Sequence, residues 1–308
     1  MKALIIDVVY DGIAPELSKY MTVDTKIRPS KEELIKIIPD YDLLVMRVDP
    51  AIDAEIMDAA KNLKVIAVSA VGLNHINLDA AKARNIQVFN APGLSTNAVA
   101  ELSIAKMLEM ARHTVAANVD VTKNHHWNKY RFLGCELQGK TLGILGFGRI
   151  GQRVGELGRA FGMNLIAYDP YLPAPVFEQQ QAKSVSIKEL VETADFVSIH
   201  MPLTPETKDL FNAESISRMK HTAVVINMSR GGIVNEQDMY NALQANKIGG
   251  YSTDVMASEL NPDADVDSPL FQCENFVVSP HLGMQTSEAF EAIGLYVIDK
   301  IKEIMKLG

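Results

Sequence analysis

Short apolar runs alternate with amphipathic stretches along most of the chain. In the first third the apolar runs cover residues 3–9, 43–46, 65–69 and 87–90. Helix-like stretches lie between them at residues 30–38 and 52–60, and Ser30 with Glu33 three residues on is the pattern of a helix N-cap. This alternation predicts βαβ units and a parallel sheet.

A long apolar helix is predicted at residues 98–119, after a turn at residues 90–93. Its first half is apolar almost all round, with Glu101, Lys106 and Glu109 as the main charged exceptions. Such a helix is normally buried, here between domains or against a second subunit, so we expect a homodimer. A second alternating series then runs from residue 142 to 280, and an amphipathic helix is predicted at residues 287–307.

Composition and charge narrow the class of protein. With 308 residues, 47% hydrophobic and 22% charged, the chain has the composition of a soluble globular protein of two domains. A net charge of −8 without a long basic run argues against nucleic acid or a membrane surface as partner. Neither a membrane-spanning stretch nor a signal peptide is evident. Two cysteines indicate no disulfide framework and no metal site, which favours a cytoplasmic enzyme.

A glycine-rich turn predicts a dinucleotide site. Residues 141–145 form an apolar strand, and a helical run extends to about residue 161. Between them lies the sequence Gly146-Phe147-Gly148-Arg149-Ile150-Gly151. Glycines there allow a tight turn and close approach of the backbone to a pyrophosphate, which the helix N-terminus then binds. The position between a strand and a helix makes the motif specific.

Asp169 indicates which dinucleotide is bound. It follows a second strand, residues 164–168, and stands 18 residues beyond Gly151. A carboxylate at this position is expected to bind the adenosine ribose hydroxyls. No Arg or Lys follows in Pro170-Tyr171-Leu172, so a 2′-phosphate would be repelled, and NAD is favoured over NADP.

Three polar residues lie at or near the downstream ends of later apolar runs. Arg230, Glu259 and His281 follow the runs at residues 223–228, 250–255 and 276–280. Carboxyl ends of parallel strands meet at one edge of a sheet, where α/β proteins place their ligands. A cation, a carboxylate and an imidazole at that edge form an acid/base set with an anion clamp.

These pieces in this order resemble the D-isomer-specific 2-hydroxyacid dehydrogenases over nearly the whole chain. The segments that carry the resemblance, besides the glycine turn, are residues 71–77, 90–93, 97–101, 127, 136–143, 200–207, 227–232, 254–255, 259 and 279–283. The resemblance implies an α/β protein of two doubly wound parallel-sheet domains with an interdomain cleft. The flavodoxin-like substrate domain would comprise residues 1–97 plus 285–308, and the Rossmann NAD-binding domain residues 98–284.

The resemblance also implies a role for each site residue. His281 would be the general acid, Glu259 its orienting partner, and Arg230 the clamp on the substrate carboxylate, with Val71 and Gly72 completing the carboxylate cradle. The cofactor-binding set would be Gly146, Gly148, Arg149, Ile150, Gly151, Asp169, His200, Pro202, Thr207, Met228, Asp254 and His281.

The identity of the substrate stays open. Arg47 stands where phosphoglycerate dehydrogenases carry an arginine that can meet the substrate phosphate, and Val68 where some of them have another. A short phosphoglycerate dehydrogenase without the regulatory domain is the first hypothesis. A glyoxylate/hydroxypyruvate reductase is the second. An NAD-sensing corepressor-like binding protein is an alternative of another class, and a formate or phosphite dehydrogenase a further one. His75, near the cradle, and His125-His126, in a predicted solvated loop, have no assigned role.

Overall fold

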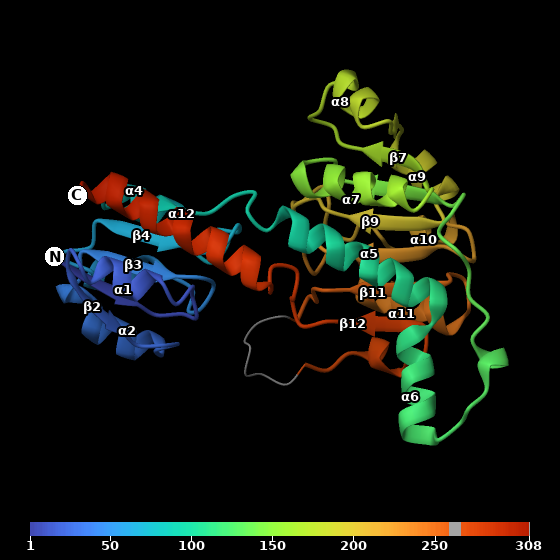
Figure 1. Ribbon diagram of the computed structural model, residues 1–308, viewed down its shortest axis with the longest axis horizontal. Coiled ribbons are helices and arrows are strands. Elements are labelled where there is room, and N and C mark those ends of the chain that lie inside the picture. The colour runs from blue at the N-terminus through green and yellow to red at the C-terminus, as the bar shows by residue number, and fades with distance from the viewer. Residues whose placement is uncertain (259–265, 308) are drawn as a thin grey trace. The chain divides into compact units, whose positions relative to one another are not determined.

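In the computed structural model, which describes residues 1–258 and 266–307, the chain divides into two compact units. Unit 1 comprises Met1–Ser95 and Met284–Gly308, and unit 2 comprises Thr96–Gly283. Each unit is built on one parallel sheet with helices on both faces (Figure 1). Two parallel-sheet α/β domains were expected from the sequence, and this is confirmed.

Unit 1 has five parallel strands in the order β2-β1-β3-β4-β5, the flavodoxin-like order. The strands are β1 (Lys2–Ile5), β2 (Thr22–Thr25), β3 (Leu43–Met46), β4 (Val65–Val68) and β5 (Gln87–Phe89). The helices are α1 (Ile13–Leu17), α2 (Lys31–Ile37), α3 (Ala54–Ala59), α4 (Leu78–Ala83) and α12 (Ser287–Met305). Ser30 caps α2 in a capping box with Glu33, as the sequence predicted.

Both faces of the unit 1 sheet are covered. Ala3 and Ile5 pack with α1 and α12, whereas Leu4 and Ile6 pack with α2 and α3 on the opposite face. Successive strand residues point to opposite faces, so a strand covered on both sides needs an unbroken apolar run. This is why the first strand has no polar alternation.

Unit 2 has seven parallel strands in the order β12-β11-β10-β9-β6-β7-β8. Its strands are β6 (Thr141–Leu145), β7 (Asn164–Tyr168), β8 (Lys183–Ser184), β9 (Phe196–Ile199), β10 (Val224–Asn227), β11 (Gly250–Thr253) and β12 (Phe276–Val278). The order reverses between β6 and β9, as in dinucleotide-binding sheets, and ligands bind beyond the carboxyl ends of the strands at such a point.

Helices cover both faces of this sheet as well. One face packs against α5 (Thr96–Arg112) and α7 (Arg149–Ala160), which lie in front of it in Figure 1. The other packs against α9 (Ile187–Thr193), α10 (Ala213–Ser217) and α11 (Glu236–Gln244). A short helix, α8 (Ala174–Gln179), lies between β7 and β8.

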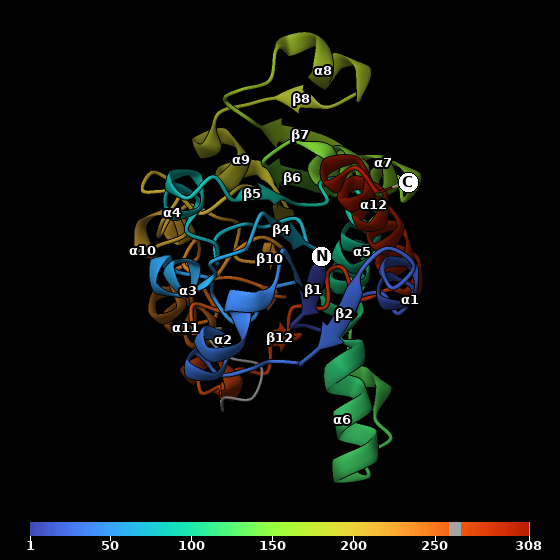
Figure 2. The same cartoon turned by 90° about the vertical axis from the view of Figure 1, so that its left-hand side faces the viewer.

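The single helix predicted at residues 98–119 is in fact two helices. His113 adopts the left-handed conformation with φ 52°, so α5 ends at Arg112 and α6 begins at Thr114 and ends at Asn124. No glycine or proline signals this break in the sequence. α5 buries one face in unit 2, whereas α6 extends away from the sheet in both ribbon views (Figures 1 and 2).

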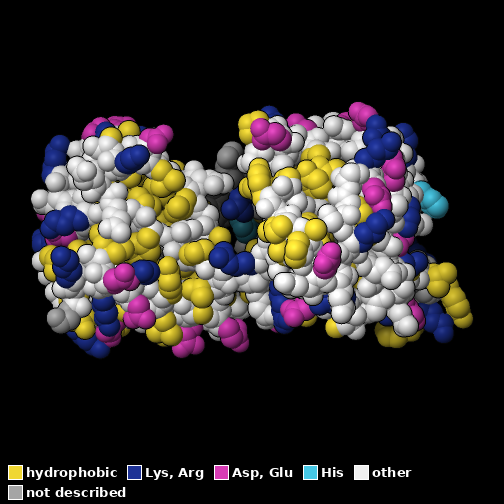
Figure 3. All heavy atoms as spheres, turned by 90° about the horizontal axis from the view of Figure 1, so that it is seen from above, with side chains coloured by type: hydrophobic (Ala, Val, Ile, Leu, Met, Phe, Trp, Pro, Cys, Tyr) yellow, Lys and Arg dark blue, Asp and Glu magenta, His cyan; other side chains and the backbone are white. Residues whose placement is uncertain are grey.

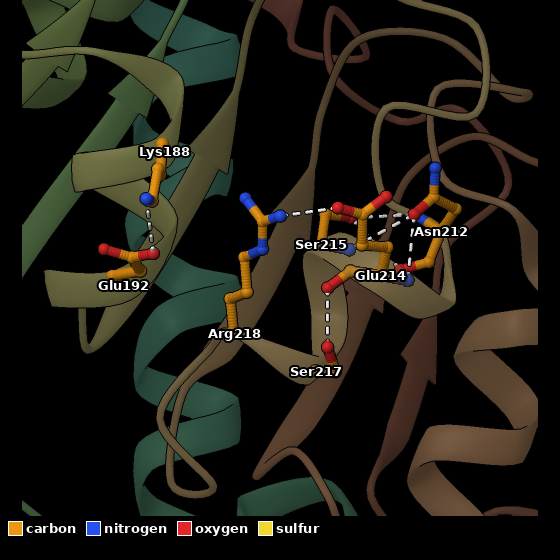
Figure 4. A network of polar contacts seen from close by, with 7 residues as sticks. All are labelled: Lys188, Glu192, Asn212, Glu214, Ser215, Ser217 and Arg218. Carbon is orange, nitrogen blue, oxygen red and sulfur yellow. Dashed lines mark hydrogen bonds and ion pairs between the residues drawn. The ribbon is translucent and has the colours of Figure 1, made fainter.

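Side-chain caps hold several short helices of unit 2. At α10, the Asn212 side-chain oxygen accepts the backbone N–H groups of Glu214 and Ser215 at 3.0 and 3.1 Å, and Ser215 Oγ accepts the N–H of Asn212 at 2.9 Å (Figure 4). Arg218 pairs with Glu214 on the solvent side (Figure 4). Such a surface pair adds little stability, so the cap defines where this five-residue helix starts.

The surface carries charges of both signs. On the face shown in Figure 3, Lys and Arg side chains are interspersed with Asp and Glu, without a large patch of one sign. Within residues 1–258 and 266–307, no helix has the length and apolar character needed to cross a bilayer.

Candidate active site

The turn after β6 has the geometry of a dinucleotide-binding turn. Gly146 has φ +85°, and a Cβ there would lie 2.7 Å from the backbone of His200 and Met201, so only glycine fits. Gly148 is the N-cap of α7, and a Cβ there would meet no atom within 4 Å. The N-terminus of α7 is therefore open at Gly148, as close approach of a phosphate group to the backbone requires, whereas a Cβ at Gly151 would lie 2.2 Å from the Gly146 oxygen.

The Asp169 carboxylate is hydrogen-bonded to the same turn. One carboxylate oxygen accepts the backbone N–H of Phe147 at 2.9 Å, and the other accepts that of Tyr171 at 3.0 Å. These bonds fix the half-buried carboxylate between the glycine turn and the end of β7. Its remaining acceptor positions are suited to ribose hydroxyls.

The residues after β9 form a closed loop. Thr207 Oγ1 donates to the backbone oxygen of Pro202 at 2.7 Å and accepts the N–H of Thr204 at 2.7 Å. His200 bonds Ser198 Oγ at 2.8 Å through Nε2, and burial lowers the pKa of His200 to about 3. His200 is therefore neutral near pH 7 and suited to form a wall of the site, not to donate a proton.

Arg230 follows β10 in a turn fixed by Asn227. The Asn227 side chain accepts the N–H of Ser229 at 3.1 Å and donates to the backbone oxygen of Arg230 at 2.9 Å. Arg230 itself donates to the Ser229 oxygen at 2.6 Å. Met228, which lies between Asn227 and Ser229, is buried with 8% of its surface exposed. The Asn227 side chain, at the end of β10, thus orders the turn that carries the Arg230 guanidinium.

Asp254 organises the neighbouring segment that carries His281. It follows β11, is 2% exposed, and accepts the N–H groups of Leu282 and Gly283 at 2.9 and 2.7 Å and the hydroxyl of Ser279. Its backbone oxygen accepts the N–H of His281 at 2.9 Å. His281 is exposed and has φ 53°. This structural role of Asp254 was missed by sequence reasoning, because its partners, one hydroxyl and two backbone N–H groups, lie 25 or more residues away.

The strand order brings these residues to one edge of unit 2. β10, β11 and β12 are adjacent and parallel, so Arg230, Asp254 and His281 all follow carboxyl ends at the same edge as the glycine turn after β6. Glu259 lies outside the described residues. Over the described part of the chain, there is no group of three or more His, Cys, Asp or Glu side chains that could hold a metal ion.

Arg47 in unit 1 follows β3, in a loop held by a buried carboxylate. Asp7 Oδ2 accepts the N–H groups of Arg47, Val48 and Asp49 at 3.1, 2.7 and 3.2 Å. No pattern in the sequence marked Asp7, since it reads as the polar end of a strand.

The guanidinium of Arg47 lies against the start of α12. It is 4.8 Å from the centre of the Phe290 ring. With the Gln285 amide oxygen turned toward it, that oxygen accepts from both terminal nitrogens at 3.0 and 3.1 Å. Nε is buried and has no hydrogen-bond partner. Burial lowers the pKa of Arg47, and the nearby Asp7 carboxylate opposes this effect.

Val71 and Gly72 follow β4 in the same unit. Val71 is 40% exposed, and its backbone oxygen accepts from the Asn90 side chain at 2.6 Å. The cradle proposed for the substrate carboxylate thus lies on a loop after a strand of unit 1, as Arg47 does.

The His125-His126 segment is an exposed loop, and a carboxylate on the preceding helix anchors it. His126 Nδ1 is 3.1 Å from an oxygen of Asp120, and Arg131 donates to the other oxygen at 2.8 Å. Asp120 lies on α6 and is 4% exposed. The segment following α6 is thereby folded back onto the helix.

The strand order of unit 2, its glycine turn and Asp169 define a dinucleotide-binding α/β protein. The sequence model for the D-isomer specific 2-hydroxyacid dehydrogenase NAD-binding domain matches residues 104–283. The chain therefore belongs to the D-isomer specific 2-hydroxyacid dehydrogenase family, and its dinucleotide is NAD.

Similar proteins carry several names. A D-3-phosphoglycerate dehydrogenase of Methanocaldococcus jannaschii is 38% identical over 99% of this chain, which spans 58% of that protein. A hydroxypyruvate reductase of Thermotoga maritima is 40% identical over 88% of this chain and 87% of its own length. The crystal structure of D-lactate dehydrogenase from Aquifex aeolicus with NAD and lactic acid superposes with a TM-score of 0.86 at 27% identity, covering 99% of this chain and 95% of that one.

Proposed function

We propose that the protein is an NAD-dependent D-2-hydroxyacid dehydrogenase that reversibly reduces C2 of a 2-keto acid. The observation that carries this proposal is the placement of Arg230, Asp254 and His281 after three adjacent strands, at the edge where the glycine turn follows β6. An anion clamp and an imidazole beside a dinucleotide site are the groups that this reaction requires.

Each residue has a distinct task in the reaction. NADH, when bound, supplies the hydride. Arg230 holds the substrate carboxylate with its planar fork of donors and polarises the adjacent carbonyl. His281 donates a proton to the carbonyl oxygen and accepts it in the reverse direction. Glu259 is proposed to bond the other ring nitrogen and favour the imidazolium. Backbone N–H groups at Val71 and Gly72 complete the carboxylate cradle, and Asp254 is proposed to bind the carboxamide of the cofactor.

The substrate we favour is 3-phosphohydroxypyruvate or its reduced form. Arg47 supports this choice, because its half-buried guanidinium is held in place by Phe290 and Gln285. A positioned guanidinium with two terminal nitrogens suits an anionic group such as phosphate. Hydroxypyruvate is the second candidate, favoured by the similarity to a hydroxypyruvate reductase over 87% of its length.

A panel of substrates tests both the proposed dehydrogenase activity and the proposed preference for a phosphorylated substrate. NADH oxidation should be followed with 3-phosphohydroxypyruvate, hydroxypyruvate, glyoxylate, pyruvate and 2-ketoisocaproate. A dehydrogenase gives turnover on at least one, and we expect the highest kcat/KM with the phosphorylated substrate. Inactivity on all five would contradict the enzyme proposal. Equal kcat/KM for phosphorylated and plain hydroxypyruvate would contradict only the role of Arg47.

We also propose a homodimer, formed through α6 and residues 125–136. Trp127 and Leu133 are 91% and 90% exposed on a segment that Asp120 holds in place, and exposed large apolar side chains on an ordered segment are typical of an interface. The dimer was first expected from the apolar helix predicted at residues 98–119, whose first half corresponds to α5 and buries eight residues within unit 2. Light scattering should give twice the chain mass, and the double variant Trp127→Ser, Leu133→Ser should give a monomer.

A cytoplasmic location is proposed as well. Cys135 and Cys273 are both free thiols, and free thiols are typical of reducing compartments. Fractionation of the source cells would test this.

A further inference from the structure

Lys106 is a buried cation in the core of unit 2. It lies on α5, is 1% exposed, and its Nζ is 3.5 Å from Ser252 Oγ on β11. An ammonium has three donors and is rarely buried unless another charge compensates it. A long hydrogen bond to one hydroxyl is weak compensation, so the carboxylates nearby become important.

The packing of α5 on β11 shows which carboxylate is near. Gly250, Ser252 and Asp254 share one face of the strand, since side chains alternate. Met110 packs against Gly250, Lys106 reaches Ser252, and Val99 packs against Gly283, whose N–H is bonded to Asp254. The helix thus runs antiparallel to the strand, with Lys106 between the glycine at the start of β11 and the Asp254 carboxylate after its end.

Two carboxylates act on the Lys106 ammonium. Burial lowers the pKa of Lys106 from 10.5, and the carboxylates of Asp254 and Glu109 act in the opposite direction. Glu109 lies one turn further along α5, toward Met110, and is half-buried. Asp254 lies on the side of the carboxyl edge, where Arg230 and His281 follow their strands. Lys106 is therefore a fixed positive charge directly beneath that edge.

We propose that Lys106 determines the preference of the site for the reduced cofactor over the oxidised one, an inference that rests on the proposed dehydrogenase function. NAD⁺ and NADH offer the same phosphates, riboses and carboxamide to the protein. They differ by one positive charge on the nicotinamide ring. A buried ammonium behind Asp254 opposes that charge and leaves the neutral ring unaffected, so it favours NADH binding and reduction of the keto acid.

The size of the effect is set by Coulomb's law in a protein environment. At an effective dielectric constant of about 20, a unit charge on the protein roughly 10 Å from a unit charge on a ligand changes the affinity for that ligand by about tenfold. Asp254 offsets part of this field. We expect the ratio Kd(NAD⁺)/Kd(NADH) to fall by roughly three- to tenfold when the charge of Lys106 is removed.

Direct binding measurements on the full chain test the proposal. Lys106→Met keeps the unbranched stem and removes the charge, and Lys106→Gln keeps a polar end near Ser252 in case the first variant does not fold. NADH is titrated by its fluorescence, and NAD⁺ by its displacement of NADH. Lys188→Met, the same charge change on the exposed face of α9, is the matched control.

The possible outcomes distinguish failure of the Lys106 proposal from failure of the proposed dehydrogenase function. A fall in the ratio for the Lys106 variants, with an unchanged ratio for Lys188→Met, supports the proposal. An unchanged ratio, or equal weakening of both cofactors, overturns it and leaves Lys106 a packing residue, with the dehydrogenase function intact. Failure of the unmodified protein to bind either cofactor overturns the proposed function itself.

Discussion

Asp254 Oδ2 accepts the backbone N–H of Gly283 at 2.7 Å, which couples the end of β11 to the segment that follows β12. The same carboxylate accepts the backbone N–H of Leu282 and the side-chain hydroxyl of Ser279, so one buried side chain anchors residues on both sides of His281. The position of the proposed acid is thus determined by a residue 27 positions earlier in the chain.

We expect Asp254→Asn to loosen this segment. An amide has only one acceptor oxygen, so at least one of the N–H groups of Leu282 and Gly283 loses its partner, at a cost of about 1–3 kcal/mol. Thermal unfolding should shift to lower temperature, and amide exchange at residues 282 and 283 should accelerate. Asp267→Asn, at an exposed site in unit 2, should change neither. Unchanged exchange at both amides would contradict the role given to Asp254.

His281→Ala should lower kcat by roughly 10²–10⁴, because the proton needed at the carbonyl oxygen would come from water. Titration of NADH fluorescence should show that the cofactor still binds. His221→Ala removes an exposed imidazole elsewhere in unit 2 and should retain full turnover. Less than a tenfold loss in the first variant would place the proton donor elsewhere.

Asp169→Ala should weaken the discrimination between NAD and NADP. The variant loses the ribose acceptor and the negative charge that repels a 2′-phosphate, so the ratio of kcat/KM for the two cofactors should shift toward NADP by about tenfold or more. The Phe147 N–H also loses its acceptor, so a modest loss of stability is expected. Glu178→Ala, on the surface of α8, is the control. Unchanged discrimination would refute the ribose role.

Gln285→Glu should act selectively on the phosphorylated substrate. The new carboxylate would pair with the terminal nitrogens of Arg47 and repel a substrate phosphate, raising KM for 3-phosphohydroxypyruvate by roughly tenfold. KM for plain hydroxypyruvate should change little. Gln285→Ala, which frees Arg47 without adding charge, separates the two effects. An equal change for both substrates would show that Arg47 does not meet the phosphate.

Acid stability of unit 1 should depend on Glu16. Hydrogen bonds from Lys19 and Lys302, both at 2.6 Å, lower the pKa of Glu16 from 4.5 to about 2. A depressed pKa in the folded state contributes stability above pH 4.5 that is lost as the pH falls toward 2. Glu16→Gln should therefore unfold at a lower temperature than the parent at pH 7, and the difference should vanish near pH 2. A difference that persisted there would point to packing instead. Glu303→Gln, which removes a partner of Lys300 within α12, serves as control.

Local patterns were sufficient for the parallel strands and the cofactor turn, whereas the division into two α/β domains was implied by the family resemblance. The glycine spacing placed the turn after β6, and Asp169 followed β7 as the spacing required. The apolar runs predicted buried strands, since strands covered on both faces lack alternation. These features depend on neighbours within a few residues or on a recurrent spacing.

Other features depend on contacts between distant segments. Asp7 holds a loop 40 residues away, Asp254 holds one 28 residues away, and neither relation leaves a pattern in the sequence. Lys106 was visible only as a charged exception in an apolar helix. The end of α5 at His113 also had no local signal, because a histidine adopts there the left-handed conformation that glycine usually adopts at helix ends.

The return of the chain to unit 1 through α12 affects the order of events during synthesis. Ile293, Val297 and Ile301, each at most 1% exposed, complete the core around Ala3 and Ile5, yet they are translated after all of unit 2. On the ribosome, unit 2 can therefore fold as a contiguous segment while the first strands still lack their cover. Of the two units, unit 1 is begun before unit 2 is translated and completed after it. The apolar surface of its first strands therefore stays uncovered longest in the nascent chain and is the surface that a chaperone would bind.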